Sequence, residues 1–196
     1  MIKIINILIG LFLTMNVNAT VLNFENIKFN STYATLASIN QSEYADFIWE
    51  HNWAVGTTGN NNYANAAHSG TQYLSNFRAD KSLTISSNTL FDFEGVWLAT
   101  PLFRNVTEWI SISAFDQYDQ LIGTTGQVSL SQKYSWVAST FDNVSYLTFT
   151  SNAYWYVLDD FTYRDVSTSV PAPTPLTFIA FGLITITMLK RKKSRF

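Results

Sequence analysis

The feature that most constrains the fold is an alternation of apolar and polar side chains, clearest in residues 106–115, Val-Thr-Glu-Trp-Ile-Ser-Ile-Ser-Ala-Phe. Ile110, Ile112 and Ala114 fall on one face of an extended strand, and the residues between them fall on the other. This period of two predicts a half-buried β-strand, since an amphipathic helix would repeat every 3.6 residues.

Similar segments recur at spacings near ten residues and are separated by polar turns. Aromatic residues make up 16% of the chain, which suits strands. We therefore expect an antiparallel all-β sandwich over residues 20–166, with one long polar loop at 56–69. The further predicted strands are 21–29, 71–77, 82–86, 90–99, 126–131, 134–140, 144–150 and 154–164.

Charge is distributed unevenly along the chain. The two ends hold six of the 12 basic residues, so residues 20–170 combine the other six with all 14 acidic residues, a net charge of −8. A nucleic-acid partner is excluded, because a phosphate-binding surface needs concentrated positive charge. The chain contains no cysteine, which fits either a reducing compartment or an exported protein that relies on the size of its core.

The N-terminus has the pattern of a secretory signal peptide. Lys3 supplies a positive charge, residues 4–15 are largely apolar, and Val17-Asn18-Ala19 offers small residues to a signal peptidase. We predict a signal peptide over residues 1–19 with cleavage after Ala19. A buried core helix is the alternative.

The C-terminus combines three elements in order. A segment with three prolines at 170–175 precedes 14 largely apolar residues at 176–189, and a basic cluster follows. A helix of that length reaches about 21 Å, short of the ~30 Å hydrocarbon core of a membrane, which suits a transient anchor. The basic cluster should remain cytoplasmic and so place the body outside.

These three elements resemble the PEP-CTERM sorting signal, with Ala172 standing where the family has glutamate. The resemblance implies that residues 167–196 are a sorting signal read by an exosortase in the inner membrane of a Gram-negative bacterium, and that the protein ends at the cell surface or in a polysaccharide matrix. A simple C-terminal membrane anchor is the alternative. The matching residues are Pro171 and Pro173, Gly182-Leu183, and Lys190, Arg191, Lys192 and Lys193.

The body also resembles a domain that is frequent in PEP-CTERM and other secreted proteins. The resemblance implies a jelly-roll β-sandwich related in shape to carbohydrate-binding modules, flanked here by the signal peptide and a single C-terminal hydrophobic helix. Its matching elements are Phe47-Ile48-Trp49, residues 69–74, Phe91-Asp92-Phe93 and residues 158–163.

Carboxylates lie in the first and last predicted strands, which are commonly neighbours in jelly rolls. The resemblance implies that Glu25, Asp159 and Asp160 hold a structural Ca²⁺, a hard cation that takes six to eight oxygen ligands. The alternative is that these residues are edge-strand charges that discourage aggregation.

Aromatic residues are the candidate ligand-facing groups. Trp49, Trp53, Tyr63 and Trp97 lie near the polar loop or on predicted strands, and exposed rings stack on the faces of sugars. The alternative is that these rings are core residues, because each aromatic side chain buries 150–250 Å².

Little in the sequence indicates catalysis. No Gly-x-Ser-x-Gly motif is present, His51 and His68 lack metal-ligand spacing, and the pair Asp92 and Glu94 is ordinary on the outward face of a strand. We predict a non-catalytic protein that binds or organises extracellular polysaccharide. The alternatives are a purely structural surface protein and a weak glycan hydrolase.

Overall fold

The computed structural model describes residues 18–59, 61–104, 108–152 and 154–166. Most of the predicted signal peptide, residues 1–17, and the whole predicted sorting signal, 167–196, lie outside the described residues. In the described part of the chain no helix is both long enough and apolar enough to span a membrane.

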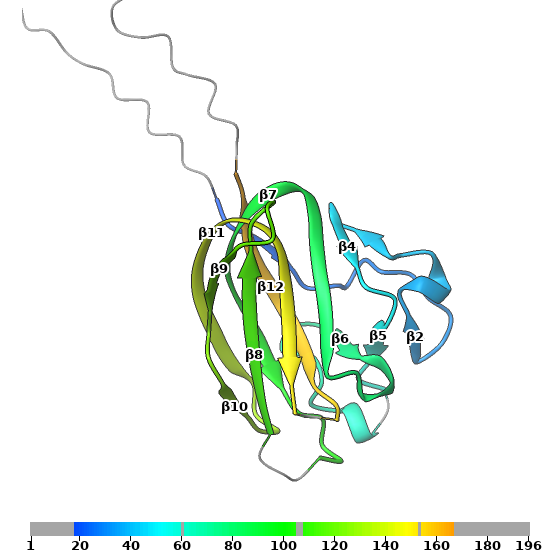
Figure 1. The fold of residues 1–196 in the computed structure, drawn as a ribbon. Coiled ribbons are helices and arrows are strands. Elements are labelled where there is room, and N and C mark those ends of the chain that lie inside the picture. The colour runs from blue at the N-terminus through cyan, green and yellow to red at the C-terminus, as the bar shows by residue number, and fades with distance from the viewer. Residues whose placement is uncertain (1–17, 60, 105–107, 153, 167–196) are drawn as a thin grey trace, which may run out of the picture. The chain divides into compact units, whose positions relative to one another are not determined.

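The described residues form twelve strands and three short 3-10 helices (Figure 1). The strands are β1 (Thr20–Leu22), β2 (Tyr33–Thr35), β3 (Glu43–Tyr44), β4 (Phe47–Trp49), β5 (Trp53–Thr57), β6 (Gln72–Asn76), β7 (Ser82–Ala99), β8 (Glu108–Phe115), β9 (Leu121–Thr124), β10 (Val128–Leu130), β11 (Ser135–Ser151) and β12 (Val157–Asp165); the helices are η1 (Ala37–Ile39), η2 (Asn61–Tyr63) and η3 (Phe77–Ala79).

All strand pairs are antiparallel, and the hydrogen-bonded path runs β10-β8-β11-β7-β12-β6-β5-β2. The two longest strands, β7 and β11, run through two layers. Register shifts between Ala138 and Tyr146 of β11 bend the pair, because bulges increase the local twist. The first layer contains β3, β4, β8, β9, β10 and the 82–87 part of β7, and the second contains β1, β2, β5, β6, β12 and the 91–99 part of β7. The predicted jelly-roll sandwich is thus confirmed.

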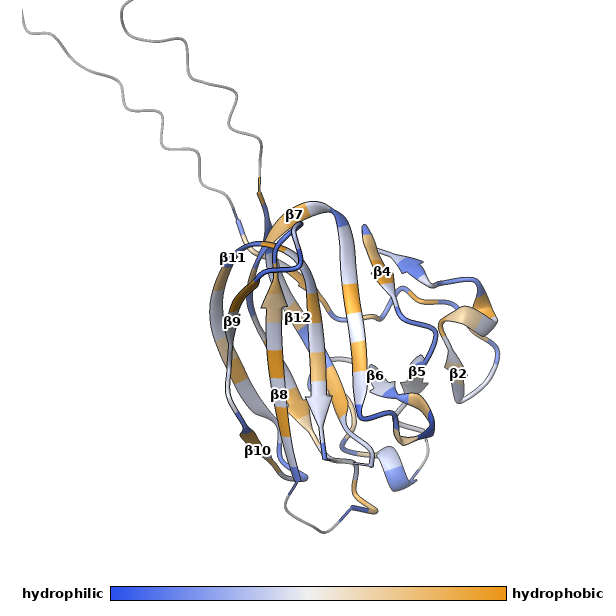
Figure 2. Ribbon diagram, viewed as in Figure 1, coloured by the Kyte–Doolittle hydropathy of each residue, from blue (hydrophilic) through white to orange (hydrophobic). Residues whose placement is uncertain are grey.

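Large side chains from both layers meet in the core. Alternating hydrophobic and polar bands run along β7 and β8 (Figure 2), and the hydrophobic positions point inward. Trp53 of the second layer packs against Phe149 of the first with ring centroids 5.5 Å apart, and Phe47 packs against Phe161 at 5.3 Å. Aromatic contacts therefore hold the layers together.

The first predicted strand is shorter than expected. Residues 21–29 do not form one strand, since β1 ends at Leu22 and Phe24 has a φ of 63°. The chain turns there so that the Phe24 side chain enters the core and Glu25 follows in a turn. In contrast, the predicted strands 82–86 and 90–99 form the single strand β7.

The first and last strands are neighbours, as the sequence predicted. β1 pairs with β12 through Thr20↔Tyr163 and Leu22↔Phe161. β1 also begins at the residue directly after the predicted signal-peptide cleavage site. The first and last described residues therefore lie near the C-terminal end of β12.

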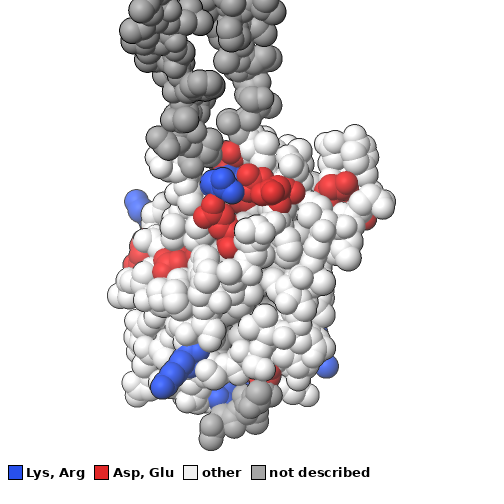
Figure 3. Space-filling model, turned by 90° about the vertical axis from the view of Figure 1, so that its left-hand side faces the viewer, with Lys and Arg blue, Asp and Glu red and all other residues white. Residues whose placement is uncertain are grey.

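Acidic groups gather on one part of the face in Figure 3, around a single basic group, and most of the rest of that face is uncharged. Within β7 and β12, Arg164 Nε lies 2.7 Å from Glu94 Oε1, and Arg164 Nη2 lies 4.0 Å from Asp92 Oδ2. Asp92 also accepts a hydrogen bond from the Asn143 backbone N–H at 2.9 Å. These two carboxylates thus hold neighbouring strands together.

Candidate functional site

The candidate site lies on the outward face of the second layer. Trp97 of β7 is opposite Trp136 of β11 on one side and opposite Asp159 of β12 on the other. Their strand neighbours Val137 and Leu98 point the other way, into the core. Strand pairing therefore places two tryptophans and a carboxylate in one row across three strands.

The two tryptophans are in contact, with ring centroids 5.6 Å apart and an angle of 53° between the rings. Trp136 lies over Gly95, where an added Cβ would be 2.4 Å from its Cζ2 atom. Gly95 therefore leaves room for the Trp136 ring, and 39% of Trp136 remains exposed.

A loop of residues 66–72, which we call the crossing loop, covers the other end of this row. The His68 ring stacks on Trp97 with centroids 4.0 Å apart and an angle of 12°. The Tyr134 hydroxyl donates to the Ala66 carbonyl at 2.5 Å, and the Tyr134 ring meets His68 edge-on at 5.4 Å. Trp136, Trp97 and His68 together form an aromatic surface that we call the platform.

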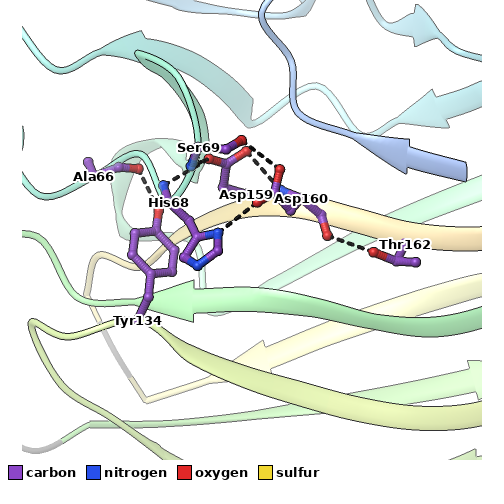
Figure 4. Close-up of polar contacts among 7 residues, drawn as sticks. All are labelled: Ala66, His68, Ser69, Tyr134, Asp159, Asp160 and Thr162. Carbon is purple, nitrogen blue, oxygen red and sulfur yellow. Dashed lines mark hydrogen bonds and ion pairs between the residues drawn. The ribbon is translucent and has the colours of Figure 1, made fainter.

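Asp159 holds the crossing loop from below (Figure 4). Its fully buried carboxylate accepts hydrogen bonds from the backbone N–H groups of His68 and Ser69, both at 2.8 Å, and from that of Asp160 at 2.7 Å. Burial, together with the neighbouring charge of Asp160, nonetheless raises the pKa of Asp159 to about 7.

Asp160 fixes the side chains of the same two loop residues. One oxygen lies 2.7 Å from His68 Nδ1 and the other accepts from the Ser69 hydroxyl at 2.6 Å. The φ of 49° at Asp160 and the register shift after Asp159 let both consecutive carboxylates face the loop. The His68 ring is thus held on Trp97 by two hydrogen bonds, one from its backbone N–H to Asp159 and one between its Nδ1 and Asp160.

Glu25 holds the far end of the crossing loop. Its Oε1 accepts from the backbone N–H of Thr71 at 2.7 Å and of Gln72 at 2.5 Å, and its Oε2 accepts from the Thr71 hydroxyl at 3.2 Å. Gly70 has a φ of 59°, and a Cβ there would lie 2.4 Å from Glu25 Cδ. Glycine is therefore required where the loop approaches the carboxylate.

The three predicted calcium ligands thus converge on one loop, but they bind hydrogen-bond donors there. Each carboxylate oxygen of Glu25, Asp159 and Asp160 accepts at least one hydrogen bond. Among the described residues no three His, Asp or Glu side chains are grouped so that they could hold a metal ion. This arrangement does not present the six to eight oxygens that Ca²⁺ takes, so calcium binding stays a prediction that requires the crossing loop to rearrange.

The predicted ligand-binding aromatics separate into core and surface residues. Trp49 and Trp53 are 1% and 0% exposed, so their assignment as ligand-facing residues was wrong. They fill the space between the two layers, where large apolar rings are most stabilising. Tyr63 is half-buried outside the platform and stacks on Tyr73 at 5.4 Å, and burial raises the pKa of Tyr63 to about 12. Of these four residues Trp97 lies in the platform.

Two platform residues were not identified from the sequence. Trp136 lies in the predicted strand 134–140 beside the inward-facing Val137, so alternation alone places it on the outward face. His68 was considered only as a metal ligand and set aside for its spacing, and no sequence signal indicates that it stacks on Trp97. That contact depends on the path of the crossing loop.

No protein-family model matches the chain, and no curated protein matches it. Among solved structures, a DUF4465 family protein from Bacteroides caccae ATCC 43185 superposes with a TM-score of 0.54 at 13% identity, over 76% of this chain and 99% of that one. The two share a fold. The CBM22-1 xylan-binding domain of Paenibacillus barcinonensis Xyn10C gives a TM-score of 0.39 at 14% identity, over 63% and 87%. TmCBM61, solved with β-1,4-galactotriose, gives 0.32 at 13%, over 67% and 90%.

Proposed function

We propose that this chain is an exported, non-catalytic protein that binds polysaccharide through the platform of Trp136, Trp97 and His68. The observation that carries the proposal is that the partly exposed Trp136 ring lies on an outward sheet face in contact with Trp97, on which the His68 ring stacks. Solved structures that resemble the chain include sugar-binding domains, such as those from Xyn10C and TmCBM61, which agrees with this function.

The chemistry of the platform suits a sugar. Apolar C–H groups of a pyranose ring can pack on the exposed Trp136 ring, since aromatic faces bind such surfaces without a fixed hydrogen-bond geometry. The Asp160 carboxylate and the Ser69 hydroxyl lie beside His68, and their remaining lone pairs supply acceptors for sugar hydroxyls. A rigid platform also loses little entropy on binding, because Asp159 and Asp160 already fix the crossing loop.

Export and sorting complete the proposal. The signal-peptide pattern of residues 1–19 and the ordered proline, apolar and basic elements of residues 167–196 support delivery across the inner membrane and processing by an exosortase. The acidic body and the surface exposure of the platform suit a polysaccharide matrix outside the cell.

Replacing Trp136 by alanine should weaken glycan binding by about tenfold or more, because the exposed stacking surface is lost. The measurement is a glycan array followed by calorimetry, with the full chain in a detergent that has no sugar headgroup. Tyr118→Ala is the matched control, since Tyr118 is 72% exposed in a turn away from the platform and should not affect binding. Equal affinity of Trp136→Ala and wild type would exclude the platform, and a silent array would favour the purely structural alternative.

Calcium is proposed separately as a structural ligand of Glu25, Asp159 and Asp160. If it binds, adding Ca²⁺ to the chelator-treated full chain should release or absorb heat and raise the melting temperature. Glu25→Gln should remove both effects, because the amide carries no charge. Absence of heat and of any change in melting temperature would reject the calcium site.

A further inference from the structure

The outward face of the first layer carries a regular array of hydroxyl side chains. Along β7, β8 and β11 the inward positions are apolar apart from Glu108 and Ser151 at strand ends, and the outward positions alternate with them. Eight serine and threonine residues occupy outward positions in three adjoining rows of β7, β8, β9 and β11, and we call them the hydroxyl face: Ser82, Thr84, Ser86, Ser111, Ser113, Thr124, Thr148 and Thr150.

Strand register arranges these residues in rows. Thr148 of β11 is opposite Thr84 of β7 on one side and opposite Ser113 of β8 on the other, and Ser113 is opposite Thr124 of β9. Thr150 is likewise between Ser82 and Ser111 in the next row. Such positions repeat at about 4.8 Å across strands and about 6.8 Å along a strand. The hydroxyls therefore form a lattice with two fixed repeats.

Aromatic rings border the lattice at both ends. Phe115 stacks on Tyr146 with centroids 4.7 Å apart and an angle of 6°, in the row beside Thr148 and Ser113. Trp109 occupies the outward position at the other end of β8 and is half-buried. The face thus presents hydroxyl groups between flat apolar rings.

The lack of charge on this face is the feature that needs explanation. The body has a net charge of −8, and solvent-facing strands normally carry lysine and glutamate for solubility. In the rows of the hydroxyl face, every outward position on β7, β8 and β11 is instead a hydroxyl or aromatic residue. An uncharged face neither attracts nor repels ions. The hydroxyls of Ser111 and Ser113 bond to that of Thr124 at 3.1 Å and 3.5 Å, and because each hydroxyl has one donor and two acceptor sites, the face keeps sites for further hydrogen bonds.

We propose that the hydroxyl face binds the surface of an uncharged, solid polysaccharide, in which parallel chains present hydroxyl groups at regular spacings. A lattice of donors and acceptors can pair with many such hydroxyls at once, so that individually weak contacts add along a rigid surface. This surface is separate from the platform and belongs to the other layer. The inference holds whether or not the platform binds soluble sugars.

The test is retention of the full chain, in the detergent described above, by suspensions of microcrystalline cellulose and of α-chitin. Thr148→Lys combined with Thr150→Lys should lower retention by at least about fivefold on whichever suspension retains wild type. The reason is that the two lysine ammonium groups would lose their hydration water when the face contacts the solid. The control is Thr140→Lys, an exposed threonine on the same strand outside the rows, which should be retained like wild type.

A second variant separates the hydroxyls from the shape of the face. Thr148→Val combined with Thr150→Val keeps shape and strand preference, so the fold should be intact while retention falls. Lack of retention of wild type, or full retention of the valine variant, would each overturn the proposal. If light scattering showed that wild type is a dimer and that the lysine variant is a monomer, the face would be assigned to self-association. That result would also overturn the proposal.

Discussion

Replacing Trp53 by alanine is expected to lower the free energy of unfolding by about 3–5 kcal/mol, the usual range for deleting a buried aromatic side chain. Trp53 is fully buried and packs edge-to-face against Trp49, Phe149 and Tyr156 at 5.5–6.0 Å. Its Nε1–H also donates to the Thr84 carbonyl at 3.0 Å. Trp53 thereby joins the two layers by packing and by a hydrogen bond, and both are lost in the variant.

Chemical denaturation followed by circular dichroism measures this effect. Trp136→Ala is the matched control, because the same change at a partly exposed ring should cost much less stability while affecting glycan binding. The pair therefore separates a core tryptophan from a surface one. Equal losses of stability in the two variants would contradict the burial that distinguishes them.

The second large effect concerns pH. The pKa of Asp159 is raised by burial from an ordinary 3.8 to about 7 in the folded state. Well below pH 3.8 the carboxyl is protonated in both states. As pH rises, the unfolded state releases its proton first, so the folded state loses stability until pH passes about 7. A shift of about three pKa units corresponds to a loss of ~4 kcal/mol across this window.

The measurement is the free energy of unfolding between pH 4 and pH 8, with a chelator present, in wild type and in Asp159→Asn. Because asparagine does not ionise, the downward trend that Asp159 contributes should disappear from the variant. Asp142→Asn is the control, since Asp142 is an exposed residue of β11 whose carboxyl stays in water in both states. Superimposable pH profiles of wild type and Asp159→Asn would show that another group is responsible.

The sequence predicted the fold well where alternation is regular. Residues 108–115 form β8 with the predicted inward and outward faces, and the aromatic segments of β7 and β12 pair in the core. It did not predict the bend that turns β7 and β11 into members of both layers. That bend depends on bulges between Ala138 and Tyr146, which are set by pairing between distant segments and not by local preference.

The candidate site was predicted in part, for a similar reason. The proximity of Glu25 to the Asp159-Asp160 pair follows from neighbouring terminal strands, and the structure brings all three to one loop. The donors that meet them include four backbone N–H groups of the crossing loop, those of His68, Ser69, Thr71 and Gln72, which composition and spacing do not encode. Trp49 and Trp53 were assigned to the surface because the sequence pattern of a short strand with large aromatic rings is the same whether the rings face the core or the solvent.

The pairing of Thr20 with Tyr163 has a practical meaning for any experiment that immobilises the protein. Asp160 lies near the start of β12 and Val166 follows its end, a separation of about 20 Å along the strand. A tether joined at either side of the described chain would therefore attach at the end opposite Asp160. Chips or beads that hold the molecule this way should leave the His68 and Trp97 rings accessible to large polymers.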